Sequence, residues 1–588
     1  MAVAPTRRAG PADEDLAEVV IVDPEPGARW SRLDRWAFGL VVAAIACAAA
    51  VLWREAETEP FHIDEFRQVR PYGSGWRELF DASFAQEQPP LDVVFGSGFQ
   101  GVFGVGDVLQ RGHSMVAGVV ALGCLAVLLW RSGVRLGASV AVLALALLPV
   151  FTSFTAYARP YALPLALMLA YLLVVDVWLD RGSWPAAIGV GILALALPLS
   201  RVFEPPAFLV LVGASVLFVG WRRGIWGRRA WLPAGAAVVA LVAVELPVYL
   251  RLQSRLTAYQ GESSASLTEQ WRRIVDDSLP LFAEVFVNWW FAALLVVVAV
   301  AWRPARSRLT AMWWFWPLLL TSVAFAVTFH VRTQPDQPFY DRYGYFWLVP
   351  FAVVLAVLTE AVVAVTRDDR RERWPMALAT GVVMMMAAYG TQLAVATADD
   401  LRTTSRVDFQ ALGLAVEDRL ALDTAVVFDS TGIDPGSFNT NFPPYARYTS
   451  PERRVFMAES LIWSPPAADG IGEFVIATNG PLVDVAGWTA VRVSPTMTVY
   501  TADATRVGAD ALGADLVRFG DAHDVAVGTT MRLAGAMILL DTGQTDAGCA
   551  ALERLLADDP TITSTVRSAT NRLDDAARTA DCVVGLSD

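Results

Sequence analysis

The chain of 588 residues contains no lysine, so all 46 of its basic residues are arginine. With its many Ala, Val and Gly residues, this bias is typical of a GC-rich bacterial genome and assigns no function to any single Arg. The sequence also has no Walker loop, GxSxG elbow, HExxH helix or CxxC pair. ATP-driven transport, serine hydrolysis and zinc-protease chemistry therefore have no support.

Positive charge is also scarce in the last third of the chain. Residues 398–588 carry 27 Asp and Glu against 14 Arg, an excess of 13 that accounts for the whole net charge of −13. Nucleic-acid binding requires clustered cations that neutralise phosphates. We therefore expect no nucleic-acid partner.

Cysteine is equally scarce, with four in the chain. Cys47 and Cys124 lie in apolar runs, where a thiol behaves as a small hydrophobic group. Cys549 and Cys582 lie in the polar tail and are the two that can pair. We predict a disulfide between them, formed in an oxidising compartment.

The chain is rich in apolar residues, with 55% hydrophobic residues and 21 Trp. Because a membrane span needs about 20 apolar residues, these features predict a polytopic α-helical membrane protein. We expect about eleven spans, at 36–53, 113–130, 136–154, 160–178, 184–199, 205–220, 230–249, 283–302, 309–329, 343–365 and 374–396. The segment 89–104 is glycine-rich and follows two prolines, so we expect an interfacial hairpin there.

The distribution of arginine predicts the orientation. Loops such as "WRRGIWGRR" and "TRDDRRERW" are rich in Arg, as is typical of cytoplasmic loops. A cytoplasmic segment 1–34 then precedes a retained signal anchor, with a cleaved signal as the alternative. The first loop, 54–111, and the tail after 396 become extracytoplasmic, in a multi-pass protein of the bacterial inner membrane.

The tail divides in two. Residues 397–504 include "DTAVVFDS", "GEFVIATNG" and "WTAVRVSPTMTVYTA", which predict strands of an extracytoplasmic α/β domain. Residues 505–588 predict helices that resemble one tetratricopeptide-type hairpin. One such unit is too little for a repeat array.

The motif "HIDE" in the first loop carries the acidic pair Asp64 and Glu65. Such carboxylates can act as a general base toward a hydroxyl or hold a divalent metal; the alternative is a solvated loop charge. Arg159 in "AYARPY" lies at the end of a predicted span, where its guanidinium can bind a lipid phosphate or extend to the interface.

A third candidate region is "FHVRTQPDQPFYDRY", in which His330, Arg332 and Arg342 favour an anionic ligand. Glu245 lies inside a predicted span, where an ionisable residue is a functional hypothesis by default. Asp176 and Glu360 lie nearer the cytoplasmic side and receive no role.

The order of these features resembles the integral-membrane type C (GT-C) glycosyltransferases, in particular the branch of the protein O-mannosyltransferases and aminoarabinose transferases. The shared features are an acidic pair in a long first external loop, a Pro-Pro-Leu stretch, an Arg-x-Tyr-Ala-Leu turn and a late Arg-Tyr before a span. The resemblance covers roughly residues 35–396.

The resemblance implies a sugar donor on a polyprenyl phosphate. It places Asp64 near the acceptor nucleophile with Glu65 beside it. The residues implied at the donor phosphate are Arg159, Tyr161, Arg342 and His330, and those assigned to the acceptor or sugar are Glu87, Glu245 and Tyr343. The chain departs from the family at Gln88, where His is usual, at Asp92, where Tyr is usual, and at Tyr157, where Glu is common.

We therefore expect an inverting hexosyl- or pentosyltransferase that acts on an extracytoplasmic polysaccharide, lipid or protein of the cell envelope. A single displacement needs one base and a stabilised leaving group, unlike the two-carboxylate double displacement of retaining glycosidases. We assign no cofactor, and a divalent metal, Mg or Mn, at Asp64 is left open. The alternative function is a multi-span transporter or lipid flippase.

Overall fold

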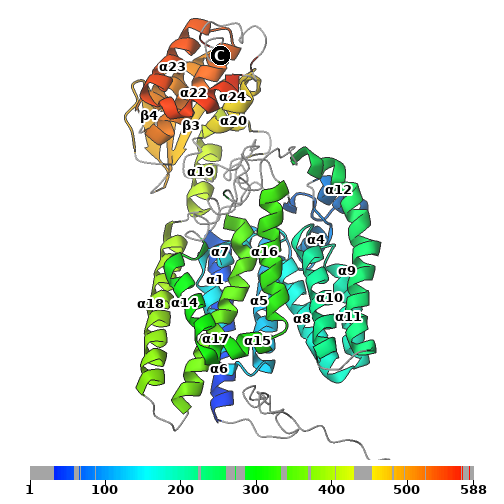
Figure 1. Ribbon diagram of the computed structural model, residues 1–588. Coiled ribbons are helices and arrows are strands. Elements are labelled where there is room, and N and C mark those ends of the chain that lie inside the picture. The colour runs from blue at the N-terminus through cyan, green and yellow to red at the C-terminus, as the bar shows by residue number, and fades with distance from the viewer. Residues whose placement is uncertain are drawn as a thin grey trace, which may run out of the picture.

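The computed structural model describes residues 32–58, 65, 68–85, 88–222, 227–259, 272, 285–332, 341–367, 373–403, 406–428, 450, 453–479, 482–494, 497–522, 525–570, 573 and 582. Long helices form a bundle, and a smaller α/β domain is attached at one end of it through α19 (Arg406–Arg419) (Figure 1). We call this end of the bundle the domain-proximal end.

Seven helical segments of the described chain are long and apolar enough to cross a membrane. They are α1 (Arg32–Thr58), α5 (Asp107–Arg131), α8 (Ala162–Arg181), α10 (Glu204–Arg222), the continuous segment Arg229–Leu252 of α11 (Arg228–Ala240), η1 (Leu241–Glu245) and α12 (Leu246–Tyr259), α17 (Leu348–Arg367) and α18 (Arg373–Thr403). Each coincides with a predicted span.

One further predicted span, 136–154, is a bent helix pair in the structure, and a second bent pair begins in the predicted span 283–302 and extends into the Arg-rich stretch after it. α6 (Arg135–Ala146) and α7 (Pro149–Ala156) meet at 72°, and α14 (Trp289–Ala301) and α15 (Arg303–Ala311) meet at 86°. In each pair a proline opens the second helix, where its fixed φ and missing N–H fit the first turn but break the preceding helix.

The remaining two predicted spans are shorter apolar helices, at α9 (Trp184–Ala196) and α16 (Phe315–Arg332). Each of the eleven expected stretches thus contains a helix, although the described residues give up to nine spans when each bent pair counts as one. The interfacial hairpin expected at 89–104 is wrong in shape. That segment is a single helix, α4 (Leu91–Phe103), because its glycines are compatible with helix between Pro90 and Gly104.

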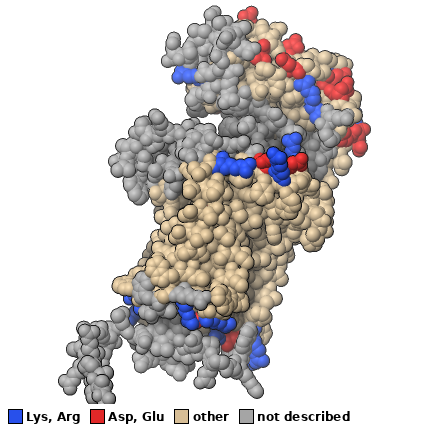
Figure 2. Space-filling model, turned by 90° about the vertical axis from the view of Figure 1, so that its right-hand side faces the viewer, with Lys and Arg blue, Asp and Glu red and all other residues tan. Residues whose placement is uncertain are grey.

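The outside of the bundle is apolar. Its exposed large side chains include Trp36, Phe38, Val42, Ile188, Ile192, Val210, Val239, Val297, Val323 and Met384. Figure 2 shows a band without charged residues between two rows of Arg, Asp and Glu at the ends of the bundle. An uncharged band of this kind matches the hydrocarbon core of a bilayer, and the chain is a multi-pass membrane protein.

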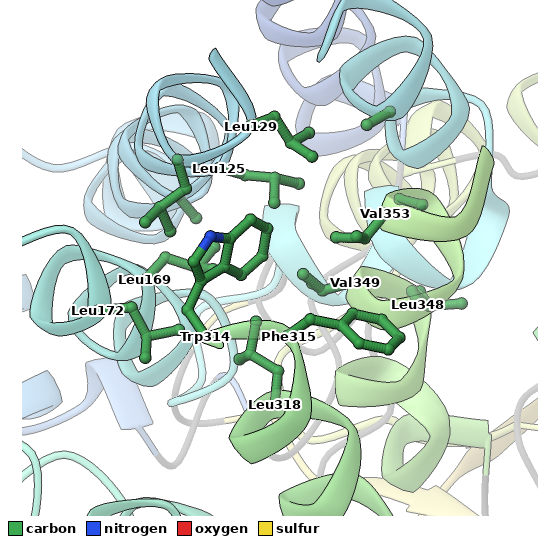
Figure 3. Close-up of a cluster of buried hydrophobic side chains, with 14 of the residues drawn as sticks. Leu125, Leu129, Leu169, Leu172, Trp314, Phe315, Leu318, Leu348, Val349 and Val353 are labelled. Carbon is green, nitrogen blue, oxygen red and sulfur yellow. The ribbon is translucent and has the colours of Figure 1, made fainter. Parts of the chain in front are cut away.

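Inside the bundle, large apolar side chains from α5, α8, α16 and α17 meet around Trp314, which is almost fully buried (Figure 3). Its indole N–H donates to the Ser132 hydroxyl at 3.0 Å, which satisfies the one polar atom of the ring. Elsewhere small residues allow close contact between helices. A Cβ added at Gly137 would lie 2.1 Å from the Ala356 carbonyl oxygen, so α6 and α17 approach only without a side chain there.

The two acids that received no role are structural. Asp176 accepts from Arg131 Nε at 2.6 Å and from the Trp313 indole at 3.1 Å. Glu360 accepts from the backbone N–H groups of Leu136 and Gly137 at the start of α6. That contact caps orphan donors at a helix N-terminus.

The C-terminal domain contains a five-stranded mixed sheet in the order β2-β1-β3-β5-β4. Its strands are β1 (Ala425–Phe428), β2 (Val455–Met457), β3 (Phe474–Asn479), β4 (Trp488–Arg492) and β5 (Met497–Ala502). The three sequence stretches read as strands supply β1, β3, β4 and β5.

Alternate residues of the sheet enter two separate cores. Val426 and Phe428 pack with α19, while Ala425 and Val427 pack with the helices on the other face. Those helices are α20 (Ala458–Trp463), α21 (Ala509–Ala522), α22 (Val525–Asp541), α23 (Thr545–Asp558) and α24 (Thr563–Thr570). Because residues of α21 to α24 share a core with β1 and β3, the segments 397–504 and 505–588 form one packed unit.

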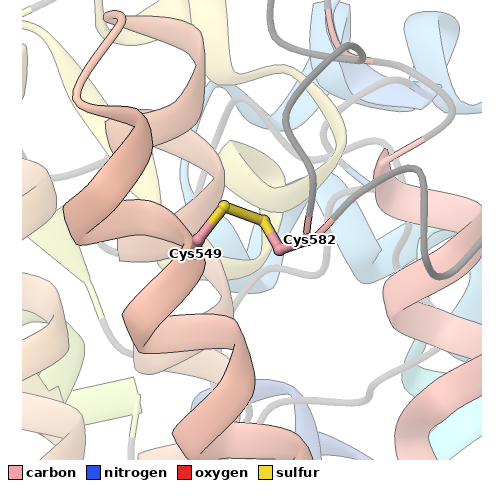
Figure 4. The surroundings of a disulfide bond; sticks show 2 residues. All are labelled: Cys549 and Cys582. Atoms are coloured by element: carbon pink, nitrogen blue, oxygen red, sulfur yellow. A yellow bond between two sulfur atoms is a disulfide. The ribbon is translucent and has the colours of Figure 1, made fainter.

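The predicted disulfide between Cys549 and Cys582 is confirmed (Figure 4). It fastens the chain at residue 582 to α23. Cys47 and Cys124 are free.

We expect non-reduced, denatured protein to contain two alkylatable thiols, and reduced protein to contain four. Replacing both Cys549 and Cys582 by Ala should lower the free energy of unfolding by roughly 2–4 kcal/mol, since the 33-residue loop is no longer closed in the unfolded chain. Thiol counting by mass spectrometry and thermal unfolding measure the two effects. Four reactive thiols without reductant would contradict the pairing.

Arg453 joins α19 to the sheet. Its fully buried guanidinium donates to Glu417 at 2.7 Å and to the carbonyl oxygens of Leu420, Ala421 and Thr424 at 2.8–3.1 Å. Partial burial raises the pKa of Glu417, but the hydrogen bonds from Arg453 and from the Ser450 N–H outweigh burial and lower it overall.

Replacing Arg453 by Met should destabilise the domain by about 3 kcal/mol or more, because the carbonyl oxygens at the end of α19 lose their donor. The lowered pKa gives wild type a contribution that is present above the ordinary Glu pKa and is lost as pH falls through the lowered value. Thermal unfolding across that pH range should show this acid-sensitive component in wild type and not in Arg453→Met. Identical profiles would refute it.

Candidate functional site

The candidate site surrounds the turn at residues 157–161, at the domain-proximal end of the bundle. The turn connects the short helix α7 to α8, and Pro160 prevents a helix from continuing through it. Arg159 N–H donates to the Tyr157 carbonyl at 2.8 Å, and Tyr161 N–H donates to the Arg159 carbonyl at 2.7 Å. These tight bonds hold the backbone on both sides of Arg159.

A buried ion pair fixes Glu65 next to this turn. We call the segment that carries Glu65 and Gln68 the acidic loop. Glu65 receives two hydrogen bonds from Arg111, from Nε at 2.7 Å and from Nη2 at 2.5 Å, and both side chains are fully buried. Arg111 also donates to the Ala56 carbonyl at the end of α1. Glu65 Oε1 accepts from the Ala158 N–H at 2.8 Å. One carboxylate therefore ties the loop to α1, α5 and the turn.

A second buried carboxylate, Asp92, binds the acidic loop at Gln68, three residues after Glu65. Its Oδ2 accepts from Gln68 Nε2 at 2.8 Å and lies 3.6 Å from His113 Nε2. The His113 Nδ1 donates to the Gln110 carbonyl at 3.0 Å. Glu65 is thus held by Arg111 and the Ala158 N–H, while Gln68 is held by Asp92.

Tyr72 lies beside this cluster, with its ring on Gly96 of α4. Burial and then the nearby carboxylates Asp92 and Glu65 raise the pKa of Tyr72 well above its ordinary value.

Arg159 projects from the turn and is half-buried. With the Gln88 amide oriented so that its oxygen faces Arg159, Oε1 accepts from both Nη1 and Nη2 at 2.9 Å. Gln88 begins the Pro-Pro-Leu stretch, so the structure brings two of the resembling motifs into direct contact.

A second arginine, Arg201, reaches the same turn from the connection between α9 and α10. It donates to the Pro160 carbonyl at 3.0 Å and pairs with Glu204 at 2.9 Å. Its guanidinium lies over the Tyr161 ring at 4.6 Å and over the Phe346 ring at 5.4 Å. These are cation–π distances.

Aromatic side chains pack beside the turn around Tyr345. Tyr345 stacks on Phe151 with ring centroids 5.6 Å apart and shares a hydrogen bond with Thr155 at 2.8 Å. Tyr345 belongs to η2 (Asp341–Trp347), which packs on α7. The short helix η2, which contains the late Arg-Tyr motif, is therefore next to the turn, with the Tyr345 and Tyr161 ring centroids 6.1 Å apart.

Several predicted site residues lie outside the part of the chain that the structure describes, wholly or in their side chains. Asp64 and Glu87 lie outside the described residues, as do the side chains of His330, Arg342 and Tyr343. Glu245 lies in the π-helical turn η1, within the span Arg229–Leu252. No hydrogen bond or ion pair in the described part of the chain connects Glu245 to the turn.

The site contains residues that the sequence reasoning missed, chiefly Arg111, Arg201, Gln68 and His113. Arg201 carried a usable signal, because it is a cation at the same predicted membrane edge as Arg159. Arg111 ends the predicted first loop and His113 begins the next predicted span, so both look like ordinary flanking residues and only the fold reveals their partners.

The sequence leaves open a divalent metal ion bound at Asp64. Within the described residues, no three His, Cys, Asp or Glu side chains gather closely enough to hold a metal ion. Asp64 is not among them, so a Mg or Mn ion there stays a prediction.

No protein-family profile matches the chain, and no curated protein matches it. The chain is similar to the solved structure of ArnT from Cupriavidus metallidurans in the apo state, at 14% identity over 79% of this chain and 98% of that one, with a TM-score of 0.46. It is similar to the structure of the same protein bound to undecaprenyl phosphate at 16% identity over 79% of this chain and 98% of that one, with a TM-score of 0.44.

It is also similar to an oligosaccharyltransferase from Archaeoglobus fulgidus in the apo form, at 12% identity over 67% of this chain and 62% of that one, with a TM-score of 0.44. All three TM-scores lie below 0.5.

We predict that Glu65→Met and Arg111→Met each cost about 3–5 kcal/mol, because each leaves a buried charge without its partner. The double variant should cost less than the sum of the two, since both charges are then gone. Thermal unfolding of wild type, the two single variants and the double variant in detergent measures these costs. Glu57→Gln, which removes an exposed pair with Arg54, should change little, and additive costs at 65 and 111 would contradict the buried pair.

Proposed function

We propose that this protein is a membrane glycosyltransferase that transfers a sugar from a polyprenyl phosphate to an acceptor hydroxyl at the domain-proximal end of the bundle. The observation that carries the proposal is the convergence at one five-residue turn. Arg159 belongs to it, Arg201 binds its Pro160 carbonyl, and its Ala158 N–H holds Glu65 of the acidic loop. Two arginines and Glu65, the neighbour of Asp64 in the sequence, thus meet at one turn.

In the proposed reaction, Asp64 removes the proton of the acceptor hydroxyl. The acceptor oxygen attacks the anomeric carbon of the donor sugar, the bond from that carbon to the phosphate oxygen breaks, and the electron pair leaves with the lipid phosphate. One displacement inverts the anomeric configuration. The Arg159 and Arg201 guanidinium groups stabilise the charge that develops on the leaving phosphate, and Arg342, Tyr161 and His330 are further candidates for that role.

Glu65 takes a different role in this proposal from its neighbour. Its oxygens already accept from Arg111 and Ala158, so it is a poor candidate for a base. We assign Glu65 to positioning and Asp64 to catalysis. Glu87, Tyr343 and Glu245 remain candidates for the acceptor or sugar.

The finer parts of the proposal concern place and substrate. The disulfide in the C-terminal domain supports an oxidising, extracytoplasmic side for that domain and for the site beneath it. The acceptor would then be a polysaccharide, lipid or protein of the envelope, and the transferred unit a hexose or pentose. The bilayer would be the bacterial inner membrane.

We expect Asp64→Asn to lower transfer by about 10²-fold or more, the scale of general-base catalysis, while donor affinity changes little. Arg159→Ala and Arg201→Ala should instead weaken donor binding, since each removes a charge-assisted contact. Lys at 159 should restore binding only in part, because it keeps the charge and loses the fork. The assay is transfer from a polyprenyl-phosphate sugar in proteoliposomes, with equilibrium donor binding.

The matched controls are Asp81→Asn and Arg77→Ala, which change exposed charges of the same loop. Wild-type transfer by well-folded Asp64→Asn would remove its catalytic role. Movement of the lipid across the bilayer without sugar transfer would favour the flippase alternative.

A further inference from the structure

The stretch Gln88–Asp92 is braced by its neighbours. Gln88 N–H donates to the Ser83 carbonyl at 3.1 Å. The buried Ser83 hydroxyl donates toward the carbonyl oxygens of Gln88 and Pro89, both at 3.0 Å. Because Pro89 and Pro90 also have fixed φ angles, the backbone that carries the Gln88 side chain has little freedom.

The same stretch is attached to two other parts of the site. Leu91 N–H donates to the Leu199 carbonyl at 2.9 Å, two residues before Arg201. Asp92 accepts from Gln68 in the acidic loop at 2.8 Å. The stretch therefore connects both arginine segments and the acidic loop, and it is a rigid base for any side chain that it presents.

With the Gln88 amide oriented so that its oxygen faces Arg159, this oxygen accepts from both terminal nitrogens of Arg159, at 2.9 Å each. One acceptor that binds both nitrogens aligns the end of the guanidinium with Gln88. A carboxylate of the same size would make the same contact, but it would add a negative charge beside the group that binds the phosphate. The amide orients Arg159 and adds no charge.

We propose that Gln88 is a positioning residue for Arg159 and that its lack of charge is required for binding an anionic lipid headgroup. The inference rests on the proposed function, in which Arg159 binds the donor phosphate. It assigns a function to the residue at which this chain departs from the pattern of the family it resembles.

Two isosteric substitutions separate orientation from charge. Gln88→Glu keeps the acceptor oxygens and adds a charge, while Gln88→Met removes the acceptor and adds none. If Gln88 were only structural, Gln88→Glu would be tolerated, since a carboxylate holds a guanidinium at least as firmly as an amide does. Gln100→Glu is the matched control, because it adds the same charge to α4, where Gln100 contacts Gln110.

The experiment measures the equilibrium affinity of the full-length protein in nanodiscs for undecaprenyl phosphate, together with its thermal stability. Gln88→Glu should weaken binding about 10- to 100-fold, the scale of a charged hydrogen bond, with no loss of stability. Gln88→Met should weaken it about tenfold, and Gln100→Glu should leave it unchanged.

The outcomes separate the two proposals. If wild type binds the lipid and Gln88→Glu binds it equally well, the requirement for an uncharged residue is refuted while the proposed function stands. Unchanged affinity in Gln88→Met would refute the positioning role. If wild type binds no polyprenyl phosphate, the proposed function fails, and the inference that depends on it fails too.

Discussion

The buried ion pair between Glu65 and Arg111 is the interaction on which the arrangement of the site depends. Both charges are removed from solvent, which is costly unless every polar atom finds a partner. Here the cost is offset by two hydrogen bonds between the side chains and by contacts to the Ala56 carbonyl and the Ala158 N–H. The pair fits only when α1, α5, the acidic loop and the turn are all in place, so it selects one arrangement of the four.

The bent helices provide the other constraint. The 72° bend between α6 and α7 changes the direction of the chain one short helix before the turn. The stacking of Phe151 on Tyr345 and the hydrogen bond between Thr155 and Tyr345 then hold η2 against α7. Segments separated by almost 200 residues thereby meet at the turn, where Phe346 of η2 contacts Arg201.

Much of the architecture could be predicted from sequence because its signals are local. Apolar length located the spans, alternation located four of the five strands, and elimination paired Cys549 with Cys582. The bends were not predicted, because apolar length alone was used to set the spans, although Pro149 inside the stretch 136–154 was a local signal for a break. The common core of the sheet and the last helices was also missed, because pairing of distant faces leaves no local pattern.

The site was predicted in part for the same reason. Arg159 stood out as a charge at a membrane edge, but the partner of Glu65 lies 46 residues away in a helix whose sequence is unremarkable. A sequence motif indicates which residues carry chemistry, while the division between Asp64 as base and Glu65 as anchor depends on which hydrogen bonds the fold has already used.

A structure of the protein with bound undecaprenyl phosphate tests the central proposal most directly. We predict that the phosphate lies within hydrogen-bonding distance of Arg159 and Arg201 at the turn 157–161. A phosphate bound at the opposite end of the bundle, near Arg131 and Arg229, would contradict the proposed site.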